Sequence, residues 1–285
     1  MNHHLKFDPF TLLHVTVVGA GGTGSHLVVL LTELHKCIQA LGGQGLMVTV
    51  FDPDEVSETN VLRQNYHRQD IGRNKAVTLV SRINLACGTG WLARPSIYTG
   101  SELVVRGQYS AATPHILFTC TDQNAARRQI GAAFGRSGKG YWIDTGNTRT
   151  TGQVLLSEPT SKEPHLPSPL KEYGELLADD DQDAPSCSAL EALTRQDLMV
   201  NREVAVKAAG LLWRLLRNGA VNHRGLIVNV QDGITLPKPI EAGMVPAYAA
   251  PPVGLIPVEV PPPAPVPAPK RRASRRRATP PGAAA

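Results

Sequence analysis

The sequence predicts an α/β fold with a Rossmann-like, mostly parallel sheet flanked by helices. Residues 15–18 form a short apolar run that leads into a glycine-rich loop and then into a helical segment. A second apolar run, residues 46–51, ends at Asp52, and a third, from Ile116, ends at Asp122. Apolar β-branched runs are typical of buried parallel strands. Polar residues at their carboxyl ends predict a ligand site at that edge of the sheet.

The loop after the first strand has the spacing of a nucleotide-binding loop. Its glycines permit a tight turn and a close backbone approach to phosphate or ribose. The helix expected over residues 25–34 offers free N–H groups and the positive end of its dipole. A plain tight turn is the alternative, but the strand–loop–helix context favours a nucleotide. The pattern G-x-G-x-x-G falls on Gly19, Gly21 and Gly24, and Gly22 adds a fourth glycine.

Asp52 ends the strand predicted over residues 46–51, where an acidic residue commonly binds a ribose hydroxyl. The interval from Gly24 to Asp52 exceeds the usual spacing of about 20 residues. The first helix or its exit loop is therefore extended. Residues 35–45, which end in several glycines, are the expected extra segment.

Polar side chains cluster beyond this second strand. Arginine and lysine there can neutralise a polyphosphate. A nicotinamide enzyme breaks no phosphate bond and needs no such pair of cations, whereas nucleotidyl transfer builds negative charge on a leaving pyrophosphate. A solvated polar turn is the alternative. The candidate binding residues are Asp52, Asp54, Asn60, Arg63, Gln64 and Lys75, and Arg63 and Lys75 are also candidate catalytic cations.

Asp122 follows the third predicted strand. A carboxylate at that position suits Mg²⁺, which takes one or two carboxylates together with phosphate oxygens. Alternatively, Asp122 is the N-cap of the helix that carries Arg127 and Arg128. The two roles are compatible.

These three patches together resemble the ThiF/MoeB/HesA family of adenylating enzymes, which are relatives of the ubiquitin-activating enzymes. The resemblance covers about residues 15–154 and lies in GAGGTGS, DPDEVSETNVLRQ, IGRNK, CTDQNAARR and GNTRTTGQV. Within the family, the chain is most similar to the ThiF-like proteins of the PRTRC system, a bacterial plasmid-type gene cassette. That narrower resemblance lies in SCSALEALTRQDLMVN and in the lack of zinc-binding cysteines.

The resemblance implies an ATP- and Mg²⁺-dependent activating enzyme, an adenylyltransferase that modifies the C-terminal carboxylate of a small ubiquitin-like or sulfur-carrier-type protein. It also implies a homodimer. In the implied site, Asp52 holds the ribose, Asp122 binds Mg²⁺, and Arg127 has a supporting role. The nucleotide loop is formed by Gly19, Gly21, Gly22 and Gly24, and the phosphates contact Asn60, Arg63 and Lys75, with Gln64 adjacent.

Two departures from the family concern its arm and its zinc. Many members carry an arginine on an N-terminal arm, but residues 1–14 contain none, so Arg68 and Arg73 are candidate substitutes. Four cysteines without a CxxC pair predict no structural zinc.

Some relatives use a crossover-loop cysteine as an acceptor, and Cys187 is the candidate here. A thiol near a helix N-terminus has a lowered pKa, although the acidic run at residues 179–183 opposes that effect. An inert cysteine is the alternative. The helix expected over residues 188–217 covers the sheet through Leu190, Leu193, Met199, Val204, Ala208, Leu211 and Leu215.

The predicted organisation is an adenylation domain over residues 1–236, with a crossover-like loop at about 157–187, and a tail over 237–285. The domain ends in an antiparallel extension, a hairpin of residues 225–230 and 233–236. The Pro-, Ala- and Arg-rich tail lacks a core composition and is expected to be extended. Its basic end permits weak nucleic-acid contact or acts only as a solubilising appendage.

Apart from that tail the chain is nearly neutral, although its net charge is +5. It has no apolar run of the roughly 18 residues that a membrane span needs and no signal-peptide pattern. With unpatterned cysteines, a cytoplasmic location is expected. His3 and His4 are expected to be exposed terminal residues rather than ligands.

Two other functions keep the same fold and ATP site. One is a tRNA threonylcarbamoyladenosine dehydratase-like enzyme, which the basic tail mildly favours. The other is a non-catalytic ATP-binding scaffold of the gene cassette, which the missing arginine arm favours.

Overall fold

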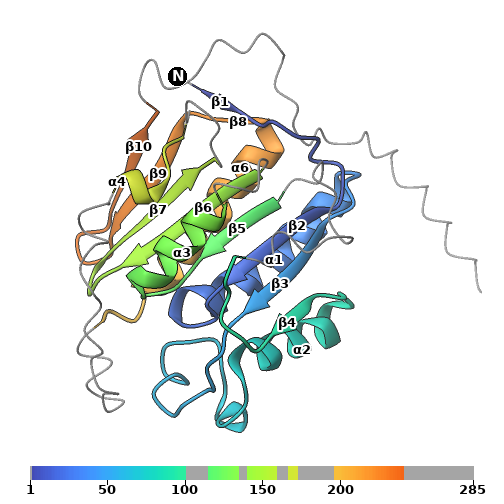
Figure 1. Cartoon of the computed structure of the whole chain (residues 1–285), viewed down its shortest axis with the longest axis vertical. Coiled ribbons are helices and arrows are strands. Elements are labelled where there is room, and N and C mark those ends of the chain that lie inside the picture. The colour runs from blue at the N-terminus through green and yellow to red at the C-terminus, as the bar shows by residue number, and fades with distance from the viewer. Residues whose placement is uncertain (1, 101–114, 135–139, 159–165, 173–195, 241–285) are drawn as a thin grey trace, which may run out of the picture.

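A single eight-stranded sheet organises the molecule, with helices on both of its faces (Figure 1). The computed structural model describes residues 2–100, 115–134, 140–158, 166–172 and 196–240. Helices α1 (Gly22–Ala40) and α6 (Val200–Asn218) pack against each other on one face. Helix α3 (Asn124–Phe134) and the short α4 (Pro169–Glu172) lie on the opposite face.

The sheet is mostly parallel: four of its seven strand pairs are parallel and three are antiparallel. The order is β10-β9-β7-β6-β5-β2-β3-β4. The pairs from β6 to β4 are parallel, and those from β6 to β10 are antiparallel. This confirms the predicted fold class, including its antiparallel C-terminal extension. The strands are β2 (Leu13–Val18), β3 (Leu46–Phe51), β4 (Leu92–Arg94), β5 (His115–Thr119), β6 (Gly140–Asn147), β7 (Thr151–Ser157), β9 (His223–Asn229) and β10 (Ile234–Pro239).

Helix α1 accounts for the long interval before Asp52. The prediction ended it at residue 34, but it continues to Ala40 because its buried stripe continues through Ile38. Gly42, at a φ of +90°, then turns the chain towards β3. After β3, the 3-10 turn η1 (Arg68–Asp70) precedes α2 (Lys75–Cys87).

Helix α6 begins at Val200, so the prediction of a helix from residue 188 is wrong for residues 196–199. The carboxylate of Asp197 accepts a hydrogen bond of 2.8 Å from the Met199 N–H, which stabilises a turn there instead. Met199 is 49% exposed, and Leu190 and Leu193 lie outside the described residues. The remaining predicted apolar face is buried: Val204, Ala208, Leu211 and Leu215.

The N-terminal segment is part of the folded core, which corrects the expectation that His3 is exposed. Strand β1 (His3–His4) pairs antiparallel with β8 (Ala220–Val221), which follows α6. His3 is 1% exposed, and its Nε2 lies 2.8 Å from the hydroxyl of Tyr141. Leu5 is also buried.

The predicted hairpin near the end of the described chain is confirmed by the antiparallel pairing of β9 and β10. Strand β10 continues to Pro239, and residues 241–285, which include most of the predicted tail, lie outside the described residues. None of the helices in the described part of the chain is both long and apolar enough to span a membrane.

Candidate functional site

The glycine loop joins β2 to α1, and two of its glycines are required by close packing. Gly19 has a φ of +93°, and a Cβ there would lie 2.7 Å from the carbonyl oxygen of Cys120. A Cβ on Gly24 would lie 1.9 Å from the carbonyl oxygen of Gly19. Gly19, Gly21 and Gly22 line the cavity described below, whereas Gly24 does not. Gly24 therefore packs against the backbone of the turn and not against the cavity.

Asp52 sits beneath this loop at the end of β3. One carboxylate oxygen accepts a hydrogen bond of 2.6 Å from the Ala20 N–H, and the other accepts one of 2.9 Å from the Asp54 N–H. Burial raises the pKa of Asp52, while these N–H groups and the charge of Lys75 oppose the rise. The two backbone bonds fix the plane of the carboxylate and leave further acceptor capacity on both oxygens.

Lys75 begins α2 and points into the same cavity. The side chain of Asn74 caps this helix by accepting a hydrogen bond of 3.0 Å from the Val77 N–H. The Lys75 ammonium lies 2.8 Å from the carboxylate of Asp54. Lys75 is 7% exposed, so its position is fixed by packing as well as by the ion pair.

Asn60 and Gln64, on the segment between β3 and η1, also line the cavity. The carbonyl oxygen of the Asn60 side chain accepts a hydrogen bond of 3.0 Å from the Ser57 N–H. Gln64 is 8% exposed, and its Oε1 has no hydrogen-bond partner among the described residues. A buried acceptor without a partner costs free energy, so a donor from a bound molecule would relieve it.

Asp122 differs from the other acidic residues of the cavity. Asp52 is bound by two N–H groups, Asp54 pairs with Lys75, and Asp144 pairs with Arg127. Asp122 is exposed and has no hydrogen bond or ion pair within the described part of the chain. The structure shows no helix-capping bond from it, since Thr121 accepts the Gln123 N–H at 3.2 Å.

Arg127, on α3, is held by a buried network. Its Nε lies 3.3 Å from Asp144 Oδ1, and one Nη donates a hydrogen bond of 2.8 Å to the carbonyl of Thr145. The Thr119 hydroxyl also contacts Asp144. Burial raises the pKa of Asp144, and Arg127 opposes the rise. This network fixes the Arg127 guanidinium at the wall of the cavity, and its supporting role stays a prediction.

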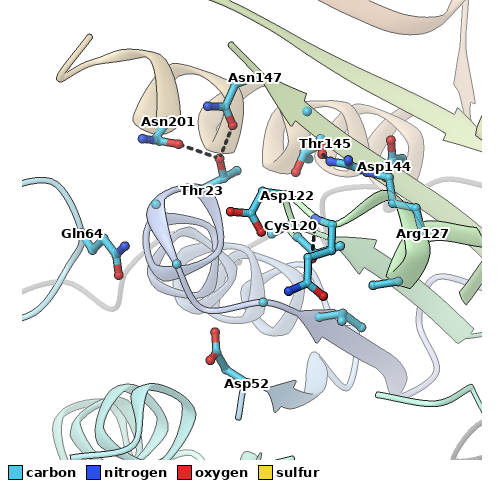
Figure 2. A pocket seen from close by; sticks show the side chains of 18 of the residues that line it. Thr23, Asp52, Gln64, Cys120, Asp122, Arg127, Asp144, Thr145, Asn147 and Asn201 are labelled. Atoms are coloured by element: carbon cyan, nitrogen blue, oxygen red, sulfur yellow. Dashed lines mark hydrogen bonds and ion pairs between the residues drawn. The ribbon is translucent and has the colours of Figure 1, made fainter. Parts of the chain in front are cut away.

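A polar wall of the cavity was not predicted from the sequence. Figure 2 shows Asn147 and Asn201 converging on the Thr23 hydroxyl, at oxygen–oxygen distances of 3.4 and 3.2 Å. Asn201, in the first turn of α6, also donates a hydrogen bond of 2.9 Å to Gln196. A Cβ on Gly22 would lie 2.6 Å from the Asn201 amide. Both motifs that carry these amides, GNTRTTGQV and TRQDLMVN, were visible in the sequence, but neither indicated a site contact.

Other predicted residues lie apart from the cavity. Arg68 and Arg73 are exposed and do not line it. Cys187 lies outside the described residues. Cys120 does line the cavity, but burial raises the pKa of its thiol to about 12, which makes it a poor nucleophile.

A cavity of about 680 Å³ lies at the carboxyl ends of β2, β3 and β5, and the glycine loop and the polar side chains described above line it. This volume is within the usual range for small-molecule sites. The predicted residues that line it are Gly19, Gly21, Gly22, Asp52, Asp54, Asn60, Arg63, Gln64, Lys75, Asp122 and Arg127.

The sequence profile of the ThiF family matches residues 10–195, which is most of the chain. The chain belongs to the ThiF family. The match extends beyond the residues that carried the sequence resemblance at both ends. A search of curated protein sequences finds no match.

Solved structures of two other proteins share this ThiF-type fold. PaaA superposes with a TM-score of 0.54 at 16% identity, covering 81% of this chain and 65% of that one. E. coli MccB with ATP gives a TM-score of 0.56 at 15% identity, covering 81% and 65%. MccB with AMPCPP and MccA gives 0.53 at 16%, covering 80% and 63%. The ThiF-family chain thus spans about two thirds of the length of these proteins.

Proposed function

We propose that this ThiF-family protein is an ATP-dependent activating enzyme that adenylates the C-terminal carboxylate of a small ubiquitin-like or sulfur-carrier-type protein. One observation carries the proposal: a single cavity joins a glycine loop and a buried ribose-type carboxylate, Asp52, to three cations and a free carboxylate. The cations are Arg63, Lys75 and Arg127. A dinucleotide oxidoreductase breaks no phosphate bond, so it has no use for these three cations and the free carboxylate.

In the proposed complex, the Asp52 carboxylate accepts hydrogen bonds from the ribose hydroxyls. The unpaired amide oxygen of Gln64 lies beside the glycine loop. The phosphates extend towards Arg63 and Lys75. A carboxylate oxygen of the acceptor attacks the α-phosphorus, and the bond from that phosphorus to the oxygen of the β-phosphate breaks. The products are an acyl-adenylate and pyrophosphate. No protein nucleophile is needed, since positioning and charge stabilisation carry the step.

The donors present fit a Mg²⁺ ion. Asp122 is the cavity carboxylate that no described residue binds or pairs, and Mg²⁺ commonly takes one or two carboxylates plus phosphate oxygens. When bound, the ion would neutralise charge on the phosphates. Asp122 would hold it at the end of β5, close to the N-terminus of α3.

The comparisons support ATP and a small acceptor as proposals. The MccB structures contain ATP in one case, and AMPCPP together with MccA in the other. We further propose a homodimer and, from SCSALEALTRQDLMVN, a place in a PRTRC-type cassette. Sedimentation would test the dimer. A neighbouring gene whose product ends in Gly-Gly would support both the cassette and the acceptor.

The proposal is tested by ATP–pyrophosphate exchange with purified protein and Mg²⁺, alone and with small proteins from the same source. We expect exchange that depends on an acceptor and is lost in Arg63→Ala. Arg217→Ala is the matched control, because Arg217 is exposed in the last turn of α6 and does not line the cavity. ATP binding without exchange under any condition would contradict adenylation and favour a scaffold. Exchange that depends on added tRNA would mean that the acceptor is a tRNA-bound carboxylate and not a small protein.

A further inference from the structure

The three cations of the cavity are held by different kinds of partner. Lys75 pairs with the carboxylate of Asp54 at 2.8 Å, and Arg127 pairs with that of Asp144 at 3.3 Å. Among the described residues, Arg63 has no carboxylate partner. Its Nη1 instead donates a hydrogen bond of 2.8 Å to the amide oxygen of Gln196.

Gln196 is the centre of a small amide network. The same amide oxygen accepts a hydrogen bond of 2.9 Å from Asn201, and the Gln196 NH₂ donates one of 3.3 Å to the carbonyl of Thr148. Asn201 in turn contacts the hydroxyl of Thr23 on α1. These contacts link Arg63 to the N-terminal turns of α1 and α6, which carry the glycine loop and the polar wall.

The amide satisfies the hydrogen-bonding geometry of Arg63 without neutralising its charge. A carboxylate in the same place would form an ion pair and reduce the attraction of Arg63 for a second anion. The Arg63 Nε is buried and has no partner among the described residues, so this face of the guanidinium retains donor capacity. Within the described part of the chain, the site thus keeps one oriented cation without a carboxylate partner beside the glycine loop.

We propose that Gln196 is a positioning residue that orients Arg63 towards the polyphosphate and preserves its net charge by being neutral. This inference rests on the proposed ATP site. It assigns a role to a side chain from outside the family motifs that led to that site.

The test is Gln196→Glu, a nearly isosteric change. We expect the new carboxylate to pair with Arg63, so that the Kd for ATP rises by about tenfold or more. The Kd for adenosine should change by less than about twofold. The melting temperature should change by only a few degrees, because the new ion pair with Arg63 offsets the loss of the 3.3 Å hydrogen bond to the Thr148 carbonyl. Titration calorimetry with ATP, AMP and adenosine measures the affinities, and calorimetric scanning measures the melting temperature.

Two control variants separate positioning from simple repulsion. Gln123→Glu adds the same charge to an exposed residue that lines the cavity without an Arg63 contact, and its effect on ATP should be less than about threefold because solvent screens it. Gln196→Ala removes the tether but adds no charge, so its Kd for ATP should lie between those of the wild type and Gln196→Glu.

Equal losses of ATP affinity in Gln123→Glu and Gln196→Glu would overturn the role of Gln196. So would unchanged ATP affinity in Gln196→Glu when the wild type binds ATP, and in that case the proposed function would stand. Failure of the wild type to bind ATP would instead remove the proposed function and this inference together.

Discussion

At the scale of single residues, the carboxylates of the cavity differ in what their removal would do. Asp122 is exposed and unbonded within the described chain, so Asp122→Ala should change the free energy of unfolding by less than about 0.5 kcal/mol. It should nevertheless abolish Mg²⁺-dependent ATP–pyrophosphate exchange. Urea unfolding and the exchange assay measure the two effects.

Asp52→Ala provides the contrast to that variant. It leaves the N–H groups of Ala20 and Asp54 without their acceptor, so the free energy of unfolding should fall by more than about 1 kcal/mol.

Full exchange in Asp122→Ala would show that the metal assignment is wrong.

We predict that His115 makes the fold less stable in acid. Burial, and then the charge of His14 on the neighbouring strand, lower the pKa of His115 to about 4. A histidine with a depressed folded pKa contributes stability above its unfolded value of about 6.5, and that stability is lost as the pH falls towards 4. The loss at pH 4 is on the order of 3 kcal/mol.

Urea unfolding between pH 7 and pH 4 tests this prediction. His115→Gln cannot take up a proton, so its stability should fall less over that range than that of the wild type. Parallel pH curves for the two proteins would contradict the role of His115.

The site shows where sequence reasoning stops at this scale. Gly19, Asp52 and Arg63 were predicted because each belongs to a local motif with a chemical reason. Gln196 and Asn201 were not predicted as site residues, because their contacts with Arg63 and Thr23 join segments far apart in the chain. An amide in a turn gives no local signal of such a partner.

At the scale of elements, helix α1 tests whether packing outweighs propensity. Alanine normally stabilises a helix interior relative to glycine by about 1 kcal/mol. Gly24→Ala should instead destabilise the fold by about 1–3 kcal/mol, because its Cβ would lie 1.9 Å from the Gly19 carbonyl oxygen. Chemical denaturation measures the change.

Gly210→Ala is the matched control on helix α6. Its Cβ would meet only the end of the Arg214 side chain, at 3.7 Å. This variant should be more stable than the wild type by about 0.5–1 kcal/mol. A stabilised Gly24→Ala would mean that the loop relaxes freely.

The helices and strands also show which element boundaries can be predicted from the sequence. Strand β3 was predicted at its observed bounds, because Asp52 follows a run of six residues in which only Thr49 is polar. The start of α6 was predicted too early, because apolar residues continue before Val200. The hydrogen bond from the Met199 N–H to Asp197 decides the start, and periodicity does not reveal it.

At the scale of the whole molecule, the N-terminus closes the fold far from the cavity. Deletion of residues 2–6 would remove buried Leu5, the contact of His3 with Tyr141 and the ion pair of Lys6 with Glu158 at 2.9 Å. We expect the unfolding free energy to fall by about 2–5 kcal/mol. ATP binding by the folded fraction should persist, since Tyr141 lies near the amino end of β6, whereas the residues at its carboxyl end line the cavity.

Lys6→Ala is the control for this deletion, because it removes one cation beside the buried Glu158 and leaves strand β1 in place. Its cost should be smaller than that of the deletion, since His3 stays 3.4 Å from the Glu158 carboxylate and Leu5 stays buried. Deletion without loss of stability would contradict the packing role of β1.

The two borders of the large sheet differ from its interior in a way that bears on self-association. A bare strand border is a template on which further chains polymerise. Here β4 offers only three residues, and β10 carries Pro237 and Pro239, which lack N–H groups, with a bulge at Lys238. Open-ended stacking of copies is therefore disfavoured at both borders, although the side chains of Ile234 and Leu236 are exposed on β10.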